Sequence, residues 1–517
     1  MRLLLAFALT PLISHAAPLS EPALFARCYA HITGHPVPAN HPLMLKVRHG
    51  EIKGLDACYT ILDKARLNTN GALADTNDLE ATQILGQFYN FHRSLFSVNS
   101  VEQLPDPDRE LGSNTDDLFD ITQPALAMTK VMLGGHKYNE LITTMGDVRA
   151  VRRAVPRLDA LGGYTQNSPS RRYFGNNAGG QPLDSLKFSF RGTQAGFAQD
   201  GSQSTQVAAP IIQTGDLIGI RPATETLMVP NFTLFPLAGS GETRGDQLAP
   251  NIVLPFNAFQ GAGAGILGYP IYMLSYWGQG KNINLNGTTK LPRRWAISTL
   301  QNLMCAQMPD LRPEDVSQFL DPNSSAPFRL QSSCLGCHAT QDQMAYTLRN
   351  YQLAFSDFEE NFATAGGIVN KTSELLVHYN ASQPSVSGWS STVVPNFNLQ
   401  QPNGRLYMRT LSGKLVDQGV SDLNGLGSAL AAQDDYYLCA AKHYFQFLTG
   451  IQVPLYDREN PANAALNKTL SPQSVADRVF LEGLGQQLKN DPNQSLITLI
   501  KSIMSSSYYR DSNFRPK

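Results

Sequence analysis

The chain has 517 residues, of which 42% are hydrophobic, which is enough for roughly two to four globular domains with well-filled cores. Its 41 lysines and arginines nearly balance its 42 aspartates and glutamates, so no net charge draws nucleic acid or an anionic membrane to it. The composition therefore indicates a globular protein and gives no support to nucleic-acid binding.

The first residues have the pattern of a secretory signal peptide, which we assign to residues 1–16. Arg2 precedes an apolar run at 3–13, and small residues precede a cleavage site after Ala16. This run is shorter than the roughly 20 apolar residues that a membrane-spanning helix needs. We therefore expect an exported protein with no membrane span in the mature chain.

Helical periodicity dominates the next unit, 17–157. Over residues 21–153 apolar positions recur at spacings of three and four, as at Leu85, Phe88 and His92. This pattern predicts an N-terminal helical domain.

The composition changes in 158–262, which is rich in Gly, Asn, Gln, Ser and Pro. Short apolar runs at 217–220 and 252–255 interrupt the polar sequence. We expect loops with short strands here.

Helical periodicity returns at 291–308, where Trp295 and Leu300 fall on one face. Several prolines then mark an extended connection that leads to Cys334, and a further helix is expected over 341–362. This arrangement would place His338 at a junction between a loop and a helix.

A short pattern occurs near both ends of the chain, at 29–38 and 445–454. Each copy follows a cysteine and contains Thr-Gly followed by proline. Gly34 and Gly450 fit the left-handed position that ends a helix. The pattern predicts two related helical modules, the second within a C-terminal helical module at 421–517.

The six cysteines divide into a C-x-x-C pair and four others. In an oxidising compartment Cys28, Cys58, Cys305 and Cys439 form an even set that can make two disulfides. We favour Cys28 with Cys58, which closes a local loop, and Cys305 with Cys439. Four buried free thiols are the alternative.

The most chemically specific motif in the sequence is Cys334-Leu335-Gly336-Cys337-His338. Each thiol can add to one vinyl group of a haem, while His338 ligates the iron as the proximal ligand. A redox pair and half of a zinc site are the alternatives, but the flanks lack a strand-to-helix context and no second C-x-x-C exists. The motif predicts one covalent haem c bound to Cys334, Cys337 and His338. Because such haem is attached outside the bacterial cytoplasm, we expect a periplasmic or secreted bacterial protein.

Short sequence segments on both sides of the motif occur in an order that resembles that of one known protein family. They are 265–270, 293–295, 302–305, 347–351, 413–450 and 495–510. Together with the motif they resemble the planctomycete-type secreted cytochrome c domains of unassigned function, over roughly the second half of the chain. That family often has an Asp-Pro pair soon after its haem histidine, where this chain has residues 340–344. The resemblance implies a secreted haem domain, without naming a reaction.

The expected fold class is therefore mainly α. A cytochrome c-like haem-binding helical region at 263–420 would have helical flanking modules and a loop-rich, short-strand central insertion. The second axial ligand of the iron decides between an electron carrier and an open, reactive haem.

Met408 is the favoured distal ligand, because it lies well after the motif in the strand-like segment 405–410, as in small c-type cytochromes. His378 and His443 are its rivals, and ordinary core packing of Met408 is the alternative. Nearby arginines can pair with the haem propionates. They are Arg349, Arg405 and Arg409.

Three functions stay open on the sequence. We favour a monohaem electron-transfer protein that meets a redox partner protein or a small-molecule electron donor or acceptor. The alternative is a haem-dependent oxidoreductase of peroxidase or oxygenase type that acts on an extracellular substrate, which the length of the chain favours. A third reading has the haem as a structural element of an envelope-binding module. No catalytic acid–base pair stands out among the dispersed carboxylates.

Overall fold

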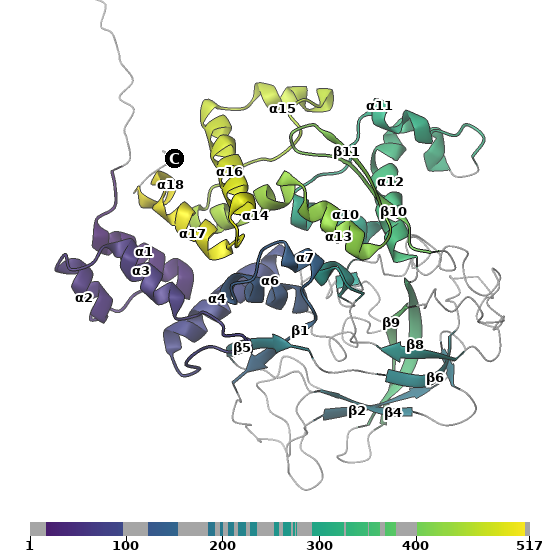
Figure 1. Cartoon of the computed structure of the whole chain (residues 1–517), viewed down its shortest axis with the longest axis horizontal. Helices are drawn as coiled ribbons and strands as arrows, with labels where there is room; N and C mark the ends of the chain where they lie inside the picture. Colours follow the sequence, from purple (N-terminus) through teal and green to yellow (C-terminus); the bar gives the residue numbers. More distant parts are fainter. Residues whose placement is uncertain are drawn as a thin grey trace, which may run out of the picture.

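The computed structural model describes most of the chain outside the leader and several central segments. The described residues are 17–96, 122–153, 185–191, 197–199, 205–210, 216–223, 228–234, 253–257, 262–269, 272–273, 276, 292–324, 327–349, 351–361, 368–378 and 401–511. The fold is mainly helical, as predicted, and it also contains small antiparallel sheets (Figure 1).

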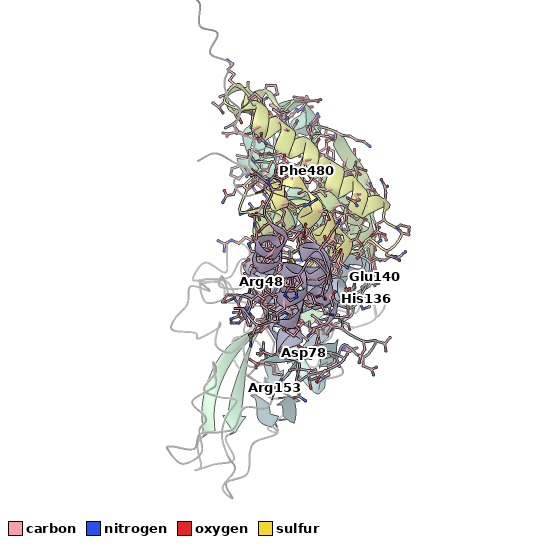
Figure 2. All side chains as sticks on the ribbon, turned by 90° about the vertical axis from the view of Figure 1, so that its left-hand side faces the viewer. Arg48, Asp78, His136, Glu140, Arg153 and Phe480 are labelled. Atoms are coloured by element: carbon pink, nitrogen blue, oxygen red, sulfur yellow. A yellow bond between two sulfur atoms is a disulfide. The ribbon has the colours of Figure 1, made fainter. Side chains whose placement is uncertain are left out.

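Six helices and one strand make up the N-terminal part. They are α1 (Glu21–Thr33), α2 (Pro42–Arg48), α3 (Gly54–Asp63), α4 (Leu79–Leu95), α6 (Gln123–Leu133), α7 (Glu140–Thr143) and β1 (Val148–Arg152). The side chain of Asp78 accepts hydrogen bonds from the first backbone amides of α4. Arg153, just after β1, donates to the Thr76 carbonyl and so holds the loop before that helix (Figure 2).

The central part contains the motif and the elements around it. They are η3 (Gly265–Gly268), α10 (Arg293–Met304), α11 (Pro313–Val316), η4 (Ser317–Phe319), η5 (Pro327–Leu330), α12 (Ser332–Ala345) and η6 (Tyr346–Leu348). The helix predicted at 291–308 is confirmed as α10. It ends at Met304 and is capped by Cys305, which has a left-handed φ of 51°.

The C-terminal part is helical, as predicted. It contains α13 (Leu423–Ala431), α14 (Asp434–Thr449), η7 (Pro461–Asn463), α15 (Ala464–Lys468), α16 (Pro472–Asn490), α17 (Leu496–Ser505) and α18 (Ser507–Arg510). None of the helices in the described part of the chain has the length and apolar character of a membrane span.

Four small antiparallel sheets complete the described structure. Their strand orders are β1-β5, β10-β11, β4-β2-β8-β9 and β3-β6-β7. The strands are β2 (Ser185–Arg191), β3 (Phe197–Gln199), β4 (Thr205–Pro210), β5 (Leu217–Pro222), β6 (Met228–Leu234), β7 (Val253–Asn257), β8 (Tyr351–Asn361), β9 (Ile368–His378), β10 (Gly404–Arg409) and β11 (Leu415–Val420). The short strands predicted at 217–220 and 252–255 correspond to β5 and β7.

The helix expected over 341–362 is wrong. The helix that contains the motif starts earlier, at Ser332, and ends at Ala345, and β8 follows at Tyr351. β8 pairs with β9 along its whole length of 11 residues. Pairing with β9, the next strand in the chain, and with the distant strand β2 therefore decides the conformation of this segment, where the local apolar spacing suggested a helix.

One hydrophobic core runs through all four units expected from the sequence after residue 16. Its buried residues extend from Leu24 in α1 to Tyr509 in α18. The two ends of the described chain lie side by side, since the Leu19 amide donates to the Arg510 carbonyl at 2.9 Å (Figure 1). The domain boundaries expected after residues 157, 262 and 420 therefore stay predictions. The hydrophobic core of the described residues continues across all three of them.

Both favoured disulfides are confirmed. Cys28–Cys58 joins α1 to α3, and Cys305–Cys439 joins the end of α10 to α14. The first links helices close in sequence, whereas the second spans a sequence separation of 134 residues.

The repeated Thr-Gly pattern has the same structure at both sites. Gly34 and Gly450 end α1 and α14 with φ values of 75° and 71°. In each case the preceding threonine hydroxyl donates to the carbonyl four residues earlier, Thr33 to Tyr29 at 2.8 Å and Thr449 to Phe445 at 2.6 Å. The pattern is thus a helix-ending device, as predicted.

A buried histidine joins α4 to the C-terminal helices, and its pH response can be predicted. His92 is fully buried, with Nδ1 2.7 Å from the Thr129 hydroxyl and Nε2 2.7 Å from the Tyr444 hydroxyl. Burial lowers its pKa from 6.5 to about 3. The folded state therefore binds fewer protons than the unfolded state between these values, so stability is complete above about pH 6.5 and is lost as the pH falls.

We expect His92→Gln to cost about 1–3 kcal/mol in free energy of unfolding at pH 7, because buried hydroxyls lose their partner. When the pH falls from 7 to 5, the free energy of unfolding of the wild type should decrease by about 2 kcal/mol because of His92, and that of the variant should lack this decrease. Urea unfolding of both proteins at the two pH values measures this. An equal gap at both pH values would show that His92 is not neutral in the folded protein.

Candidate functional site

The motif lies in the first two turns of α12, after Gln331 in an extended conformation. Cys334 and His338 are one turn apart and so share a face of the helix, with Cys337 beside them. All three side chains are partly exposed, and both cysteines are free thiols. The expectation that His338 lies at a junction between a loop and a helix is corrected, because the helix begins six residues before it.

The remaining faces of α12 are buried, which explains why the motif side chains point outward. Leu335 and Ala339 pack in a small core with Tyr407 of β10. Gly336 lies against Pro309, where a Cβ atom would come within 3.2 Å of the proline Cβ. The small residue inside the motif thus lets the chain segment before α11 approach the helix closely.

The ring of His338 is held from two sides. The Phe328 ring of η5 stacks on it, with the ring centroids 4.3 Å apart and the planes inclined by 23°. Nδ1 of His338 is buried without a hydrogen-bond partner, and it lies 3.7 Å from Oδ1 of Asp342. A small rotation of either side chain would bring these two atoms into a hydrogen bond.

Asp342 is itself fixed by Arg293 of α10. The guanidinium donates to both carboxylate oxygens, from Nε at 2.5 Å and from its terminal nitrogen at 3.1 Å. Burial raises the pKa of Asp342, but the His338 ring and the Arg293 charge outweigh it and hold this pKa below its ordinary value. The carboxylate therefore stays ionised beside the Nδ1 atom of His338.

Asp310 is a second carboxyl group near the motif. It is 9% exposed, and Oδ1 lies 3.3 Å from the Thr340 hydroxyl, which donates to it. Burial raises the pKa of Asp310 to about 7. The pKa of Cys337 is raised by its own burial and by the charge of Asp310. Cys337 is therefore a protonated thiol at neutral pH.

The structure does not bring Met408 to the exposed side of His338. Met408 is fully buried and pairs with Val416 in the β10–β11 ladder. Its neighbour Tyr407 packs against α12, and successive side chains of a strand point to opposite faces. Met408 as the distal ligand thus stays a prediction that would require β10 to leave this position.

The two histidine rivals lie elsewhere. His443 is on α14, with Nε2 3.4 Å from Cys439 Sγ, next to a disulfide. The backbone of His378 ends β9, and its side chain is outside the described residues.

The three arginines proposed for the propionates have protein partners. Arg409 forms a two-pronged ion pair with Asp315, with distances of 2.6 and 2.7 Å. Arg405 pairs with Asp417 across the β10–β11 ladder, and Arg349 donates to the Gln401 carbonyl at 3.2 Å.

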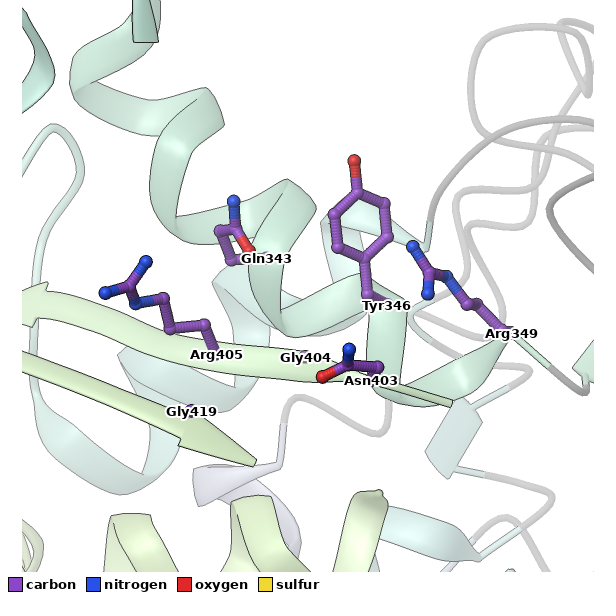
Figure 3. A pocket seen from close by; sticks show the side chains of 7 residues that line it. All are labelled: Gln343, Tyr346, Arg349, Asn403, Gly404, Arg405 and Gly419. Carbon is purple, nitrogen blue, oxygen red and sulfur yellow. The ribbon is translucent and has the colours of Figure 1, made fainter. Parts of the chain in front are cut away.

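A polar pocket of about 380 Å³ lies beside the C-terminal end of α12 (Figure 3). Its lining residues are Gln343, Tyr346, Arg349, Asn403, Gly404, Arg405 and Gly419. Gln343 follows His338 by five residues, which places the two about 140° apart around the helix. The pocket and the motif are therefore separate features of α12.

Comparison of the chain with models of protein families, with curated proteins and with solved structures gave no match. The resemblance to the planctomycete-type cytochrome domains therefore rests on the residues quoted from the sequence.

The donor set fits a covalent haem. Two thiols and an imidazole share the outward side of one helix, and the orphaned Nδ1 atom faces an ionised carboxylate. Histidines that ligate metals usually donate their second nitrogen to such a group. Asp342 was missed by the sequence reasoning, although its spacing of four residues from His338 is a readable helical signal. Phe328, which stacks on the ring, and Arg293, which pairs with Asp342, gave no signal.

We expect Asp342→Asn to raise the midpoint potential of a haem bound at His338. The negative carboxylate stabilises the ferric state, which has one more positive charge than the ferrous state. Its loss should raise the midpoint potential by on the order of 60 mV, which corresponds to a tenfold change in the equilibrium constant of one-electron reduction. Redox titration of the visible spectrum measures the shift. Asp216→Asn is the control, because Asp216 is an exposed carboxylate that pairs with Arg153, and an equal shift in that variant would contradict the role of Asp342.

Proposed function

We propose that this protein is a periplasmic or secreted bacterial monohaem c-type cytochrome-like protein that transfers electrons. Cys334 and Cys337 would hold the haem through thioether bonds, and His338 would ligate the iron. A bound haem c supplies one-electron exchange at the iron. The electrons would pass to or from a redox partner protein or a small-molecule donor or acceptor.

The observation that carries this proposal is the arrangement on α12. Both thiols lie with His338 on the outward side of one rigid helix, where a flat cofactor can approach all three. The other four cysteines are paired as disulfides, whereas Cys334 and Cys337 remain thiols. Thioether formation needs two free thiols, so this division of the six cysteines favours attachment at the motif.

Three neighbours would tune the bound group. Phe328 fixes the plane of the His338 ring, and Asp342 favours the proton on Nδ1, which leaves Nε2 for the iron. Arg293 holds Asp342 ionised and also lies over the Phe328 ring, 5.2 Å from its centroid. These contacts orient the ligand before the cofactor arrives.

A haem-dependent oxidoreductase of peroxidase or oxygenase type is the second candidate. The observation in its favour is the position of Met408, which points away from the side of α12 that carries His338. An iron without a protein ligand on its second side can bind peroxide or oxygen.

The deciding experiment is the visible spectrum, oxidised and reduced, of the full chain matured in a periplasm that attaches c-type haem. Haem that survives acid–acetone extraction supports attachment at the motif. A low-spin spectrum that becomes high-spin in Met408→Ala supports electron transfer with Met408 as ligand. A high-spin spectrum with rapid cyanide binding favours the oxidoreductase, and the absence of covalent haem refutes both.

A further inference from the structure

A second group of metal-ligating side chains lies in the main core. Within the described ranges, Cys305, Cys439 and His443 are the one group of three such residues whose ligand atoms lie within 4.8 Å of one another. Cys439 and His443 are one turn apart on α14, and Cys305 lies at the end of α10. We propose that these three side chains bind one Cu⁺ ion when the Cys305–Cys439 disulfide is open. The copper-bound form and the disulfide would then be two alternative states of the Cys305 and Cys439 sulfurs.

The distances between the ligand atoms suit a metal. Nε2 of His443 lies 3.4 Å from Cys439 Sγ and 3.7 Å from Cys305 Sγ. A metal bound at about 2.3 Å from sulfur and about 2.0 Å from nitrogen holds such atoms roughly 3.6–3.8 Å apart. The nitrogen is therefore already in place. Only the two bonded sulfurs must separate, to about 3.8–4.0 Å, and side-chain rotation can achieve this.

The number and type of donors favour Cu⁺. Thiolates select soft cations such as Cu⁺ and Zn²⁺. Structural zinc sites have four protein ligands, but no fourth His, Cys, Asp or Glu belongs to this group among the described residues. Three donors satisfy Cu⁺. A complex of Cu⁺ with two thiolates and a neutral imidazole has a net charge of −1. The positive charge of Lys442, which acts on His443, offsets this negative charge.

The chemistry balances without an unnamed reactant. Nε2 of the His443 imidazole supplies the nitrogen ligand, 3.4 Å from Cys439 Sγ and 3.7 Å from Cys305 Sγ. Each thiol loses its proton to water as two Cu–S bonds and one Cu–N bond form, and no electron is transferred. Disulfide formation instead removes two electrons and two protons from the same pair, and a protein disulfide oxidant accepts them. The newly exported chain carries both thiols, so copper can bind before the disulfide closes.

The test uses the full chain with Cys334→Ser and Cys337→Ser, so that the motif thiols cannot bind copper and the result does not depend on haem. The protein is reduced with a phosphine without oxygen and kept cold, circular dichroism verifies that it keeps its helices, and Cu⁺ is titrated in competition with bathocuproine disulfonate. We expect the reduced protein to bind one more Cu⁺ ion per chain than the oxidised protein, which should bind none at this site. His443→Ala should weaken this site at least tenfold, as loss of a ligand does.

Two controls define the site. His136→Ala removes a histidine that pairs with Glu140 on the surface (Figure 2), and it should leave copper binding unchanged. Cys305→Ala with Cys439→Ala reports any copper held by Cys28 and Cys58, where Met504 Sδ lies 3.5 Å from Cys28 Sγ. Equal copper binding in the His443→Ala variant overturns the proposal. Displacement of Cu⁺ by equimolar Zn²⁺ overturns the assignment of the metal.

Discussion

The variant with Cys334→Ser and Cys337→Ser is expected to contain no covalent haem, whereas the wild type should contain about one haem per chain. The two thiols are the unpaired cysteines of the chain, and both lie on the outward side of α12. Serine hydroxyls do not form thioethers, so the covalent link disappears while the His338 ligand remains. The haem content after acid–acetone extraction measures the effect.

The same variant should keep its fold. Both cysteines are partly exposed and make no disulfide, so the substitutions should change the free energy of unfolding by less than about 1 kcal/mol. The single variants should each retain haem through one thioether bond. If the double variant kept haem through extraction, the motif would not be the attachment site. If it failed to fold, the single variants would still test attachment, because one thioether gives a different reduced spectrum from two.

Removal of the Cys305–Cys439 disulfide is expected to have the largest effect on stability. This bond closes a loop with a sequence separation of 134 residues, against 30 for Cys28–Cys58. Loop-closure entropy assigns about 5 kcal/mol to the long loop and about 4 kcal/mol to the short one. Since a domain has a total stability of about 5–15 kcal/mol, Cys305→Ala with Cys439→Ala should leave the protein close to unfolding at 37 °C.

Urea unfolding of the two double-alanine variants measures the difference. The pair at Cys28 and Cys58 serves as the matched control, because both disulfides are buried in the same core and join two helices. A larger loss from Cys28→Ala with Cys58→Ala would show that local packing, rather than loop length, sets the contribution of each bond. A loss below about 1 kcal/mol in both variants would mean that the unfolded chain is not restrained by these bonds.

Several features were predictable because they depend on a few neighbouring residues. The even number of the four remaining cysteines allowed two disulfides, and the pairing favoured because Cys28 and Cys58 close a local loop is confirmed, as is Cys305–Cys439. Gly34 and Gly450 end their helices because a left-handed φ favours glycine. The candidate attachment residues Cys334, Cys337 and His338 were likewise readable from spacing alone.

Other features depend on contacts between distant segments and could not be read locally. The segment after the motif became β8 because it pairs with the distant strand β2 as well as with β9, although its apolar spacing also suits a helix. The surroundings of His338 come from Phe328, which stacks on its ring, and from Arg293, which the fold brings to Asp342.

The sequence by itself therefore determined the candidate donor set and the two helix ends at Gly34 and Gly450, because each follows from chemistry within a few residues, and it favoured the cysteine pairing that the structure confirms. The tertiary structure decided the orientation of that donor set. Packing of Tyr407 against α12 turns Met408 to the other face of β10, and the meeting of α10 with α14 places His443 beside the Cys305–Cys439 sulfurs. Side-chain direction depends on which faces are buried, and burial is settled only when the whole chain packs.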